Sequence, residues 1–98
     1  MYQEIYVIED NTILTNKLKK IFENEKEYVF INVNSNNLVE GMQTIPDLII
    51  IDEDNISANI IEVCNYIRTN NDNAITPIMV ISSTIDKQHR LDILKNKK

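Results

Sequence analysis

Four short runs of apolar residues are spaced along the chain. Three of them are nearly continuous in β-branched residues, which is the pattern of parallel strands covered on both faces. The remaining run alternates between apolar and polar positions in its latter half, as an edge strand does. The pattern therefore predicts strands over 4–9, 28–33, 47–52 and 77–82, of which 28–33 is the alternating one.

Apolar residues at helical spacing fill the gaps between these runs, with polar residues on the opposite face. Asn11 or Thr12 can cap the first of these helices, and Asn55 or Ser57 can cap the third. The last segment has the weakest stripe. The predicted helices are 13–22, a short one within 36–42, 56–67 and 84–97.

The order of these elements is β-α-β-α-β-α-β-α. Such alternation implies right-handed crossovers and a parallel sheet, so the expected fold is a doubly wound α/β fold. Ligands of these folds lie beyond the carboxyl ends of the strands, near the switch in strand order. The polar residues expected at that edge are Glu9, Asp10, Asp52, Ser82 and Ser83.

Three carboxylates at one sheet edge repel one another unless their charge is offset. A divalent cation such as Mg²⁺ is the simplest solution, since it binds one or two carboxylates together with a phosphate oxygen. Asp52 is a candidate nucleophile toward phosphorus, and the hydroxyl of Ser82 is a candidate partner for a phosphoryl oxygen. The alternatives are that Glu9 and Asp10 are charges at a helix N-terminus and that Ser82 is a helix cap.

The composition restricts the function further. The chain has 98 residues, enough for one domain, and a net charge of -5, which argues against direct nucleic-acid binding. Its one cysteine allows no intrachain disulfide, and we expect a core position for it. No apolar run approaches the roughly 18 residues of a membrane span, and the first residues do not resemble a signal peptide. A cytoplasmic protein without membrane contact is expected.

Segments 5–10, 46–52 and 77–83 are similar to the receiver domains of response regulators, the chemotaxis-regulator-like superfamily. The most specific segment is Pro-Asp-Leu-Ile-Ile-Ile-Asp at 46–52, and the similarity extends over nearly the whole chain. It implies a flavodoxin-like (βα) receiver fold for residues 1–98. It also implies a phosphoacceptor module of a two-component system, with no enzymatic activity beyond its own phosphorylation and dephosphorylation.

Carried over to this sequence, the resemblance assigns a role to each residue at the strand ends. Asp52 would be the phosphoacceptor, and Ser82 the switch residue that turns toward the phosphoryl group. Glu9, Asp10, Asp52 and the backbone carbonyl of Asp54 would bind Mg²⁺. The expected partners are a sensor histidine kinase and an output domain C-terminal in the parent protein.

The sequence departs from the family pattern after the phosphoacceptor and at its end. The loop Glu53-Asp54-Asn55-Ile56-Ser57 has neither the usual Pro nor the usual Gly, and its extra acids add charge beside Asp52. The family's fifth strand, with its phosphate-binding Lys and aromatic switch residue, is missing after Lys98. We therefore expect four βα units and a domain incomplete at its C-terminus. We also expect a chain that is either marginally stable or self-associates through the exposed fourth strand.

Two alternatives remain open at this point. A pseudo-receiver would keep the fold but act as a protein-interaction or dimerisation module that is never phosphorylated. A flavodoxin-like cofactor binder is disfavoured, because the strand-end loops are acidic and nearly lack the glycines that let backbone N–H groups approach a phosphate.

Overall fold

The computed structural model describes residues 2–70 and 73–83 and contains one parallel sheet. The strands are β1 (Gln3–Ile8), β2 (Tyr28–Val33), β3 (Leu48–Asp52) and β4 (Ile78–Ile81), in the order β2-β1-β3-β4. All four lie where the apolar runs predict them, and β2 is at an edge of the described sheet. The predicted helix over 84–97, with His89 and the terminal lysines, lies outside the described residues.

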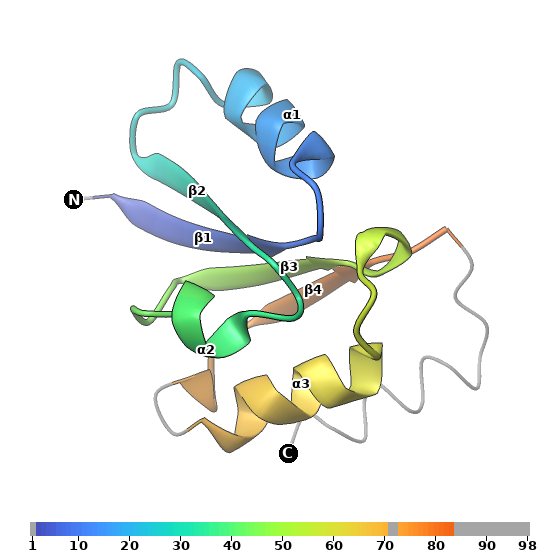
Figure 1. Cartoon of the computed structure of the whole chain (residues 1–98). Coiled ribbons are helices and arrows are strands. Elements are labelled where there is room, and N and C mark those ends of the chain that lie inside the picture. The colour runs from blue at the N-terminus through green and yellow to red at the C-terminus, as the bar shows by residue number, and fades with distance from the viewer. Residues whose placement is uncertain (1, 71–72, 84–98) are drawn as a thin grey trace.

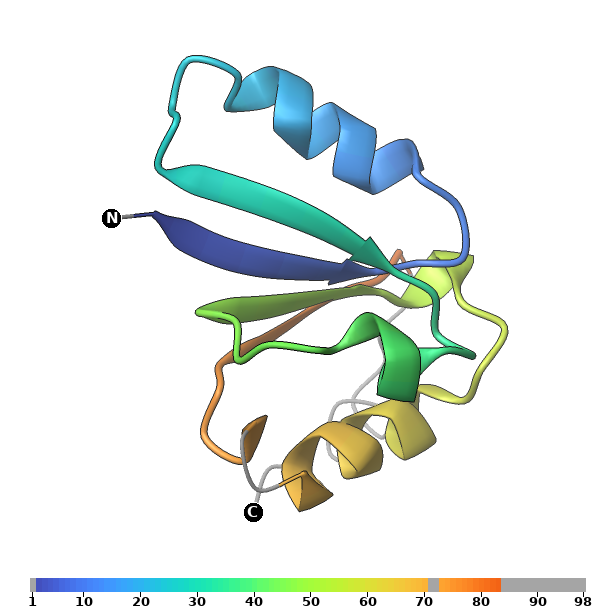
Figure 2. The ribbon, with the colours of Figure 1, turned by 60° about the vertical axis from the view of Figure 1, so that its left-hand side comes forward.

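The helices lie on both faces of this sheet. They are α1 (Ile13–Ile21), α2 (Leu38–Gly41) and α3 (Ile60–Thr69), with a short 3₁₀ helix, η1 (Glu53–Asn55), directly after β3. Figure 1 shows α1 on one side of the sheet and α2 and α3 on the other, and Figure 2 shows the same three layers from another side. The prediction of a doubly wound α/β fold is confirmed.

Alternate residues of the central strands supply the two halves of the core. Tyr6 and Ile8 of β1 belong to the cluster on the α3 side, which also contains Cys64. Ile5 and Val7 belong to the cluster on the α1 side. Because both faces are covered, β1 and β3 read as continuous apolar runs in the sequence.

Helix α3 begins four residues later than the periodicity suggests, and the predicted caps at Asn55 and Ser57 are wrong. Asn59 is the N-cap instead, and its side-chain oxygen accepts hydrogen bonds from the backbone N–H groups of Ile61 (2.8 Å) and Glu62 (3.3 Å). Ile56 still packs against the core from the loop, so its apolar character extends the stripe without extending the helix.

The order of the strands creates a switch point between β1 and β3. The chain leaves β1 toward β2 on one side, and it leaves β3 toward β4 on the other. The carboxyl ends of β1 and β3 therefore lie at the switch point, which is the usual ligand position in such sheets. In the part of the chain described, no helix is long and apolar enough to cross a membrane.

Candidate functional site

The register of the sheet brings the predicted site residues to one edge. Ile8 of β1 pairs with Ile51 of β3, so Glu9 and Asp52 are the next residues on two neighbouring strands. Asp52 in turn pairs with Ile81 of β4, and Ser82 follows directly. The acidic and hydroxyl residues predicted to meet at the carboxyl ends of the strands do so in the fold.

Glu9 is fully buried (0 % exposed), and its carboxylate points to the start of α1. It accepts hydrogen bonds from the backbone N–H groups of Leu14 (3.1 Å) and Thr15 (2.7 Å) and from the Thr15 hydroxyl (2.6 Å). The side-chain amide of Asn32 in β2 is a further donor at 3.4 Å. A carboxylate there satisfies N–H groups that have no partner inside the helix and interacts favourably with its dipole. The alternative role, a negative charge at a helix N-terminus, therefore describes the contacts of Glu9.

Asp10 connects two loops at the same edge. One carboxylate oxygen accepts from the backbone N–H of Ser35 (2.9 Å), after β2, and the other from that of Ser57 (2.6 Å), after η1. Burial by itself would raise the pKa of Asp10, but the hydrogen bonds from Ser35 and Ser57 together lower it below its ordinary value. Asp10 is therefore held ionised, and each oxygen keeps a lone pair that could face a cation.

Asp52 ends β3 and is largely buried (8 % exposed). Its Oδ2 accepts a hydrogen bond of 2.7 Å from the side-chain amide of Asn55. The sequence pattern misses this contact, because Asn55 there is a candidate helix cap. The spacing of three residues within one 3₁₀ turn is the signal that could have revealed it, since residues i and i+3 eclipse in such a turn.

The loop after Asp52 also reaches the end of β4. The carboxylate of Asp54 is exposed and accepts a hydrogen bond of 2.9 Å from the backbone N–H of Ser83. Ser82, the residue before it, is half-buried. The side chain of Asp54 therefore connects the loop after β3 to the residues after β4. The sequence does not predict this hydrogen bond.

The oxygen donors of this edge fit a magnesium ion only in part. Within residues 2–70 and 73–83, no three carboxylate, thiol or imidazole side chains form a metal-binding group. Asp10 and Asp52 carry hard oxygen donors of the kind that Mg²⁺ prefers, and Mg²⁺ often takes no more than two carboxylates from a protein; their predicted role as metal ligands stays a prediction. Glu9 fits less well, because its two oxygens already accept four hydrogen bonds. Its predicted role as a metal ligand stays a prediction.

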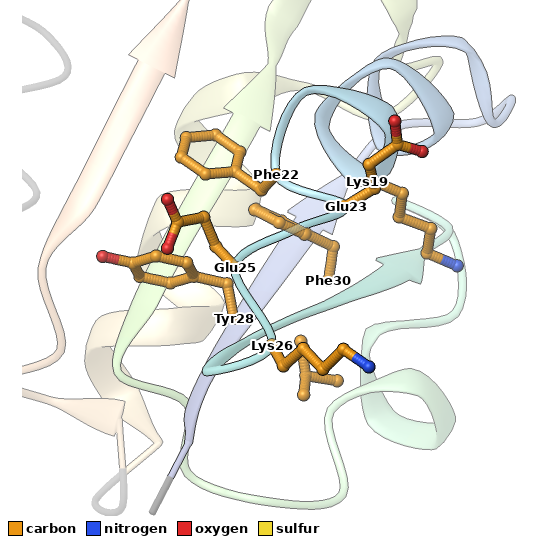
Figure 3. A pocket seen from close by; sticks show the side chains of 8 residues that line it. Lys19, Phe22, Glu23, Glu25, Lys26, Tyr28 and Phe30 are labelled. Carbon is orange, nitrogen blue, oxygen red and sulfur yellow. The ribbon is translucent and has the colours of Figure 1, made fainter.

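A hollow of about 320 Å³ lies at the other end of β2. Three aromatic rings meet there, with centroids 5.4 Å apart for Phe22 and Tyr28 and 5.6 Å for Phe22 and Phe30. Figure 3 shows these rings with lysine and glutamate side chains of both signs around them. A six-residue strand is roughly 17 Å long, so this hollow is remote from the carboxylates at the opposite end.

Several solved structures of response regulators and receiver domains share this fold. The phosphorylated cyanobacterial phytochrome response regulator RcpA matches with a TM-score of 0.80 and 18% identity, over 98% of this chain and 76% of that one. The receiver domain of a signal transduction histidine kinase from Syntrophus aciditrophicus matches with a TM-score of 0.75 and 25% identity, over 96% and 72%. That of a Pseudomonas aeruginosa sensor histidine kinase, with a magnesium ion in its active-site cleft, matches with a TM-score of 0.76 and 18% identity, over 98% and 80%.

At the level of sequence, no protein-family model matches this chain, and no curated protein matches it either. The structural similarity extends over nearly the whole chain and includes the strand order β2-β1-β3-β4. The chain therefore has the CheY-like receiver fold of two-component signalling proteins.

Proposed function

We propose that this chain is the phosphoacceptor module of a two-component system, and that Asp52 takes the phosphoryl group in a Mg²⁺-dependent reaction. The observation that carries the proposal is the position of Asp52 at the end of β3, beside β1, at the switch point of a receiver fold. It is supported by two neighbours in fold, one of which is phosphorylated and another of which holds magnesium in its active-site cleft.

Each residue at the edge has a role in this proposal. The carboxylates of Asp10 and Asp52 and the backbone carbonyl of Asp54 would hold Mg²⁺, which would neutralise the charge of the incoming phosphoryl group. The hydroxyl of Ser82 would donate a hydrogen bond to a phosphoryl oxygen. Glu9 would add negative charge near the metal ion while its carboxylate accepts hydrogen bonds from the start of α1. Phosphorylation at this edge would then change the conformation of a surface that an output domain or partner binds.

The test is incubation with acetyl phosphate and Mg²⁺, followed by intact-mass measurement. We expect the wild-type chain to gain the mass of one phosphoryl group and Asp52→Asn to gain none. Asp47→Asn is a matched control at the other end of β3 and should be labelled like the wild type. A gain that persists in Asp52→Asn, or no gain in the wild type, would contradict the proposal.

The second candidate is a pseudo-receiver that binds a partner without being phosphorylated. One observation favours it: the two oxygens of Glu9 accept four hydrogen bonds from the protein, so a cation would have to compete with these donors for Glu9. Magnesium titration by calorimetry separates the two candidates. The pseudo-receiver predicts no measurable affinity in the wild type and unchanged partner binding by Asp52→Asn.

A further inference from the structure

Asn55 makes three hydrogen bonds that converge on the carboxylate edge. Its side-chain Nδ2 donates to Asp52 Oδ2 at 2.7 Å, and its Oδ1 accepts from Asn11 Nδ2 at 3.3 Å. Its backbone carbonyl accepts from the N–H of Asp10 at 2.7 Å. One residue thus links the candidate nucleophile, the candidate metal ligand and the loop after β1.

The backbone of η1 explains how Asn55 reaches Asp52. Asp52 is the residue that precedes the first turn of η1, and Asn55 is its last residue. Because a 3₁₀ helix has three residues per turn, the side chain at i+3 lies above the residue at i. The donor is therefore fixed by a turn directly attached to β3, and Asn55 is half-buried there.

We infer that Asn55 is a positioning residue for phosphoryl transfer to Asp52, because its side-chain amide occupies Oδ2 and leaves Oδ1 as the attacking oxygen. This inference rests on the proposed function. The two oxygens of a carboxylate exchange places when its side chain rotates, so only a fixed donor distinguishes them. A hydrogen bond from one side holds the plane of the group and aims the second oxygen at the phosphorus.

The reaction balances with a small acyl phosphate as the donor. Oδ1 of ionised Asp52 forms a bond to phosphorus, and the bond between phosphorus and the acyl oxygen breaks. The electron pair of that bond leaves with the carboxylate product, so no proton is transferred. Oδ2 becomes the carbonyl oxygen of the aspartyl phosphate, and the amide of Asn55 remains on it.

Three variants separate the positioning of the Asp52 carboxylate by Asn55 from the effect of an added charge and from a general effect on the structure. Asn55→Asp is isosteric and keeps an oxygen for Asn11, but it replaces the donor on Asp52 by an acceptor. Asn55→Ala removes the donor without adding charge. Asn59→Asp is the matched control, because it adds the same charge in the following loop, keeps an acceptor for the N–H groups of Ile61 and Glu62, and replaces a side chain that makes no hydrogen bond to Asn55 or Asp52 in the described part of the chain.

The measured quantity is the rate of phosphorylation by acetyl phosphate, as a function of its concentration. Loss of the donor that fixes the plane of the carboxylate predicts a maximal rate about tenfold lower in Asn55→Asp and Asn55→Ala, since a misplaced reacting group can cost up to roughly 100-fold in rate. The half-saturating concentration should stay within about twofold, since Asn55 does not bind the donor in this scheme, and Asn59→Asp should react like the wild type. Wild-type rates in Asn55→Ala, or equal slowing in Asn59→Asp, would overturn the inference while the proposed function stands.

The hydrogen bond can also be tested without a phosphodonor. In the NMR spectrum of side-chain amides, Asp52→Ala should move the signals of Asn55 Nδ2, because its acceptor is gone. Unchanged signals overturn the inference whether or not the wild-type chain is phosphorylated. Failure of the wild type to react, with the signals moving as expected, would overturn the proposed function and with it the role of Asn55 in phosphoryl transfer, while the hydrogen bond between Asn55 and Asp52 would stand.

Discussion

Replacing Glu9 by alanine tests whether this buried carboxylate stabilises the folded protein by binding the start of α1. The change leaves the N–H of Leu14 and both the N–H and the hydroxyl of Thr15 without their acceptor. Thr15 is itself buried (1 % exposed), so water replaces the lost acceptor poorly.

The magnitude follows from counting these donors. A buried donor left without a partner costs about 1–3 kcal/mol, and water can reach the partly buried Leu14 more easily than Thr15. The total cost is therefore about 3–5 kcal/mol, a large share of the roughly 5–15 kcal/mol that stabilises a small domain. At about 4–8 °C per kcal/mol for a domain of this size, the melting temperature should fall by roughly 12–40 °C.

The assay is urea unfolding followed by circular dichroism, in buffer without Mg²⁺. Glu23→Ala is the control, because Glu23 is exposed and its truncation should change the free energy of unfolding by less than about 0.5 kcal/mol. If Glu9→Ala unfolds within that same margin of the wild type, the carboxylate does not hold α1 as described. A loss of Mg²⁺ affinity without a loss of stability would instead identify Glu9 as a metal ligand.

Three further substitutions test other contacts. Arg68→Met removes an Nη1 that donates to three backbone carbonyls before β4, and thermal melts should show a loss of about 2–3 kcal/mol; a change below about 0.5 kcal/mol would contradict this. Gly41→Ala places a Cβ 2.7 Å from Val33 Cγ1, so urea unfolding should show a loss of about 1–3 kcal/mol, and unchanged stability would refute the clash. Because the pKa of Asp10 is lowered in the folded chain, its ionised form adds stability above its ordinary pKa of 3.8, and this contribution is lost as the pH falls through the folded pKa. The difference in unfolding free energy between the wild type and Asp10→Asn should therefore shrink in acid, and a difference independent of pH would exclude this linkage.

The sheet could be predicted from the sequence because its signals are local and agree with one another. The runs at 4–9 and 47–52 are covered on both faces, so the residues between their acidic ends are all apolar and mostly β-branched. Once the strands alternate with helices, chirality and the parallel sheet follow. The meeting of Glu9, Asp10 and Asp52 at one edge needs only that topology.

The directions of the side chains at that edge could not be predicted in the same way. Glu9 and Asp10 are neighbours in sequence, yet one carboxylate turns to α1 and the other to the loops at Ser35 and Ser57. Which donor a carboxylate finds depends on loop conformations that apolar periodicity does not report. The same limit explains the cap of α3: several Asn and Ser residues precede that helix, and the backbone selects Asn59.

From the sequence, mutual repulsion among the carboxylates predicts a cation at this edge. The hydrogen bonds in the structure offset part of that repulsion without one. Each of the four acids is offset by protein donors: Glu9 by α1, Asp10 by two loop amides, Asp52 by Asn55 and Asp54 by the N–H of Ser83. Fixed N–H dipoles stabilise negative charge where it stands. These hydrogen bonds reduce the need for a metal ion in the resting edge. Under the proposed function, Mg²⁺ would be needed when a phosphoryl group adds its own charge to Asp52, so we expect magnesium dependence to belong to the reaction and not to the fold.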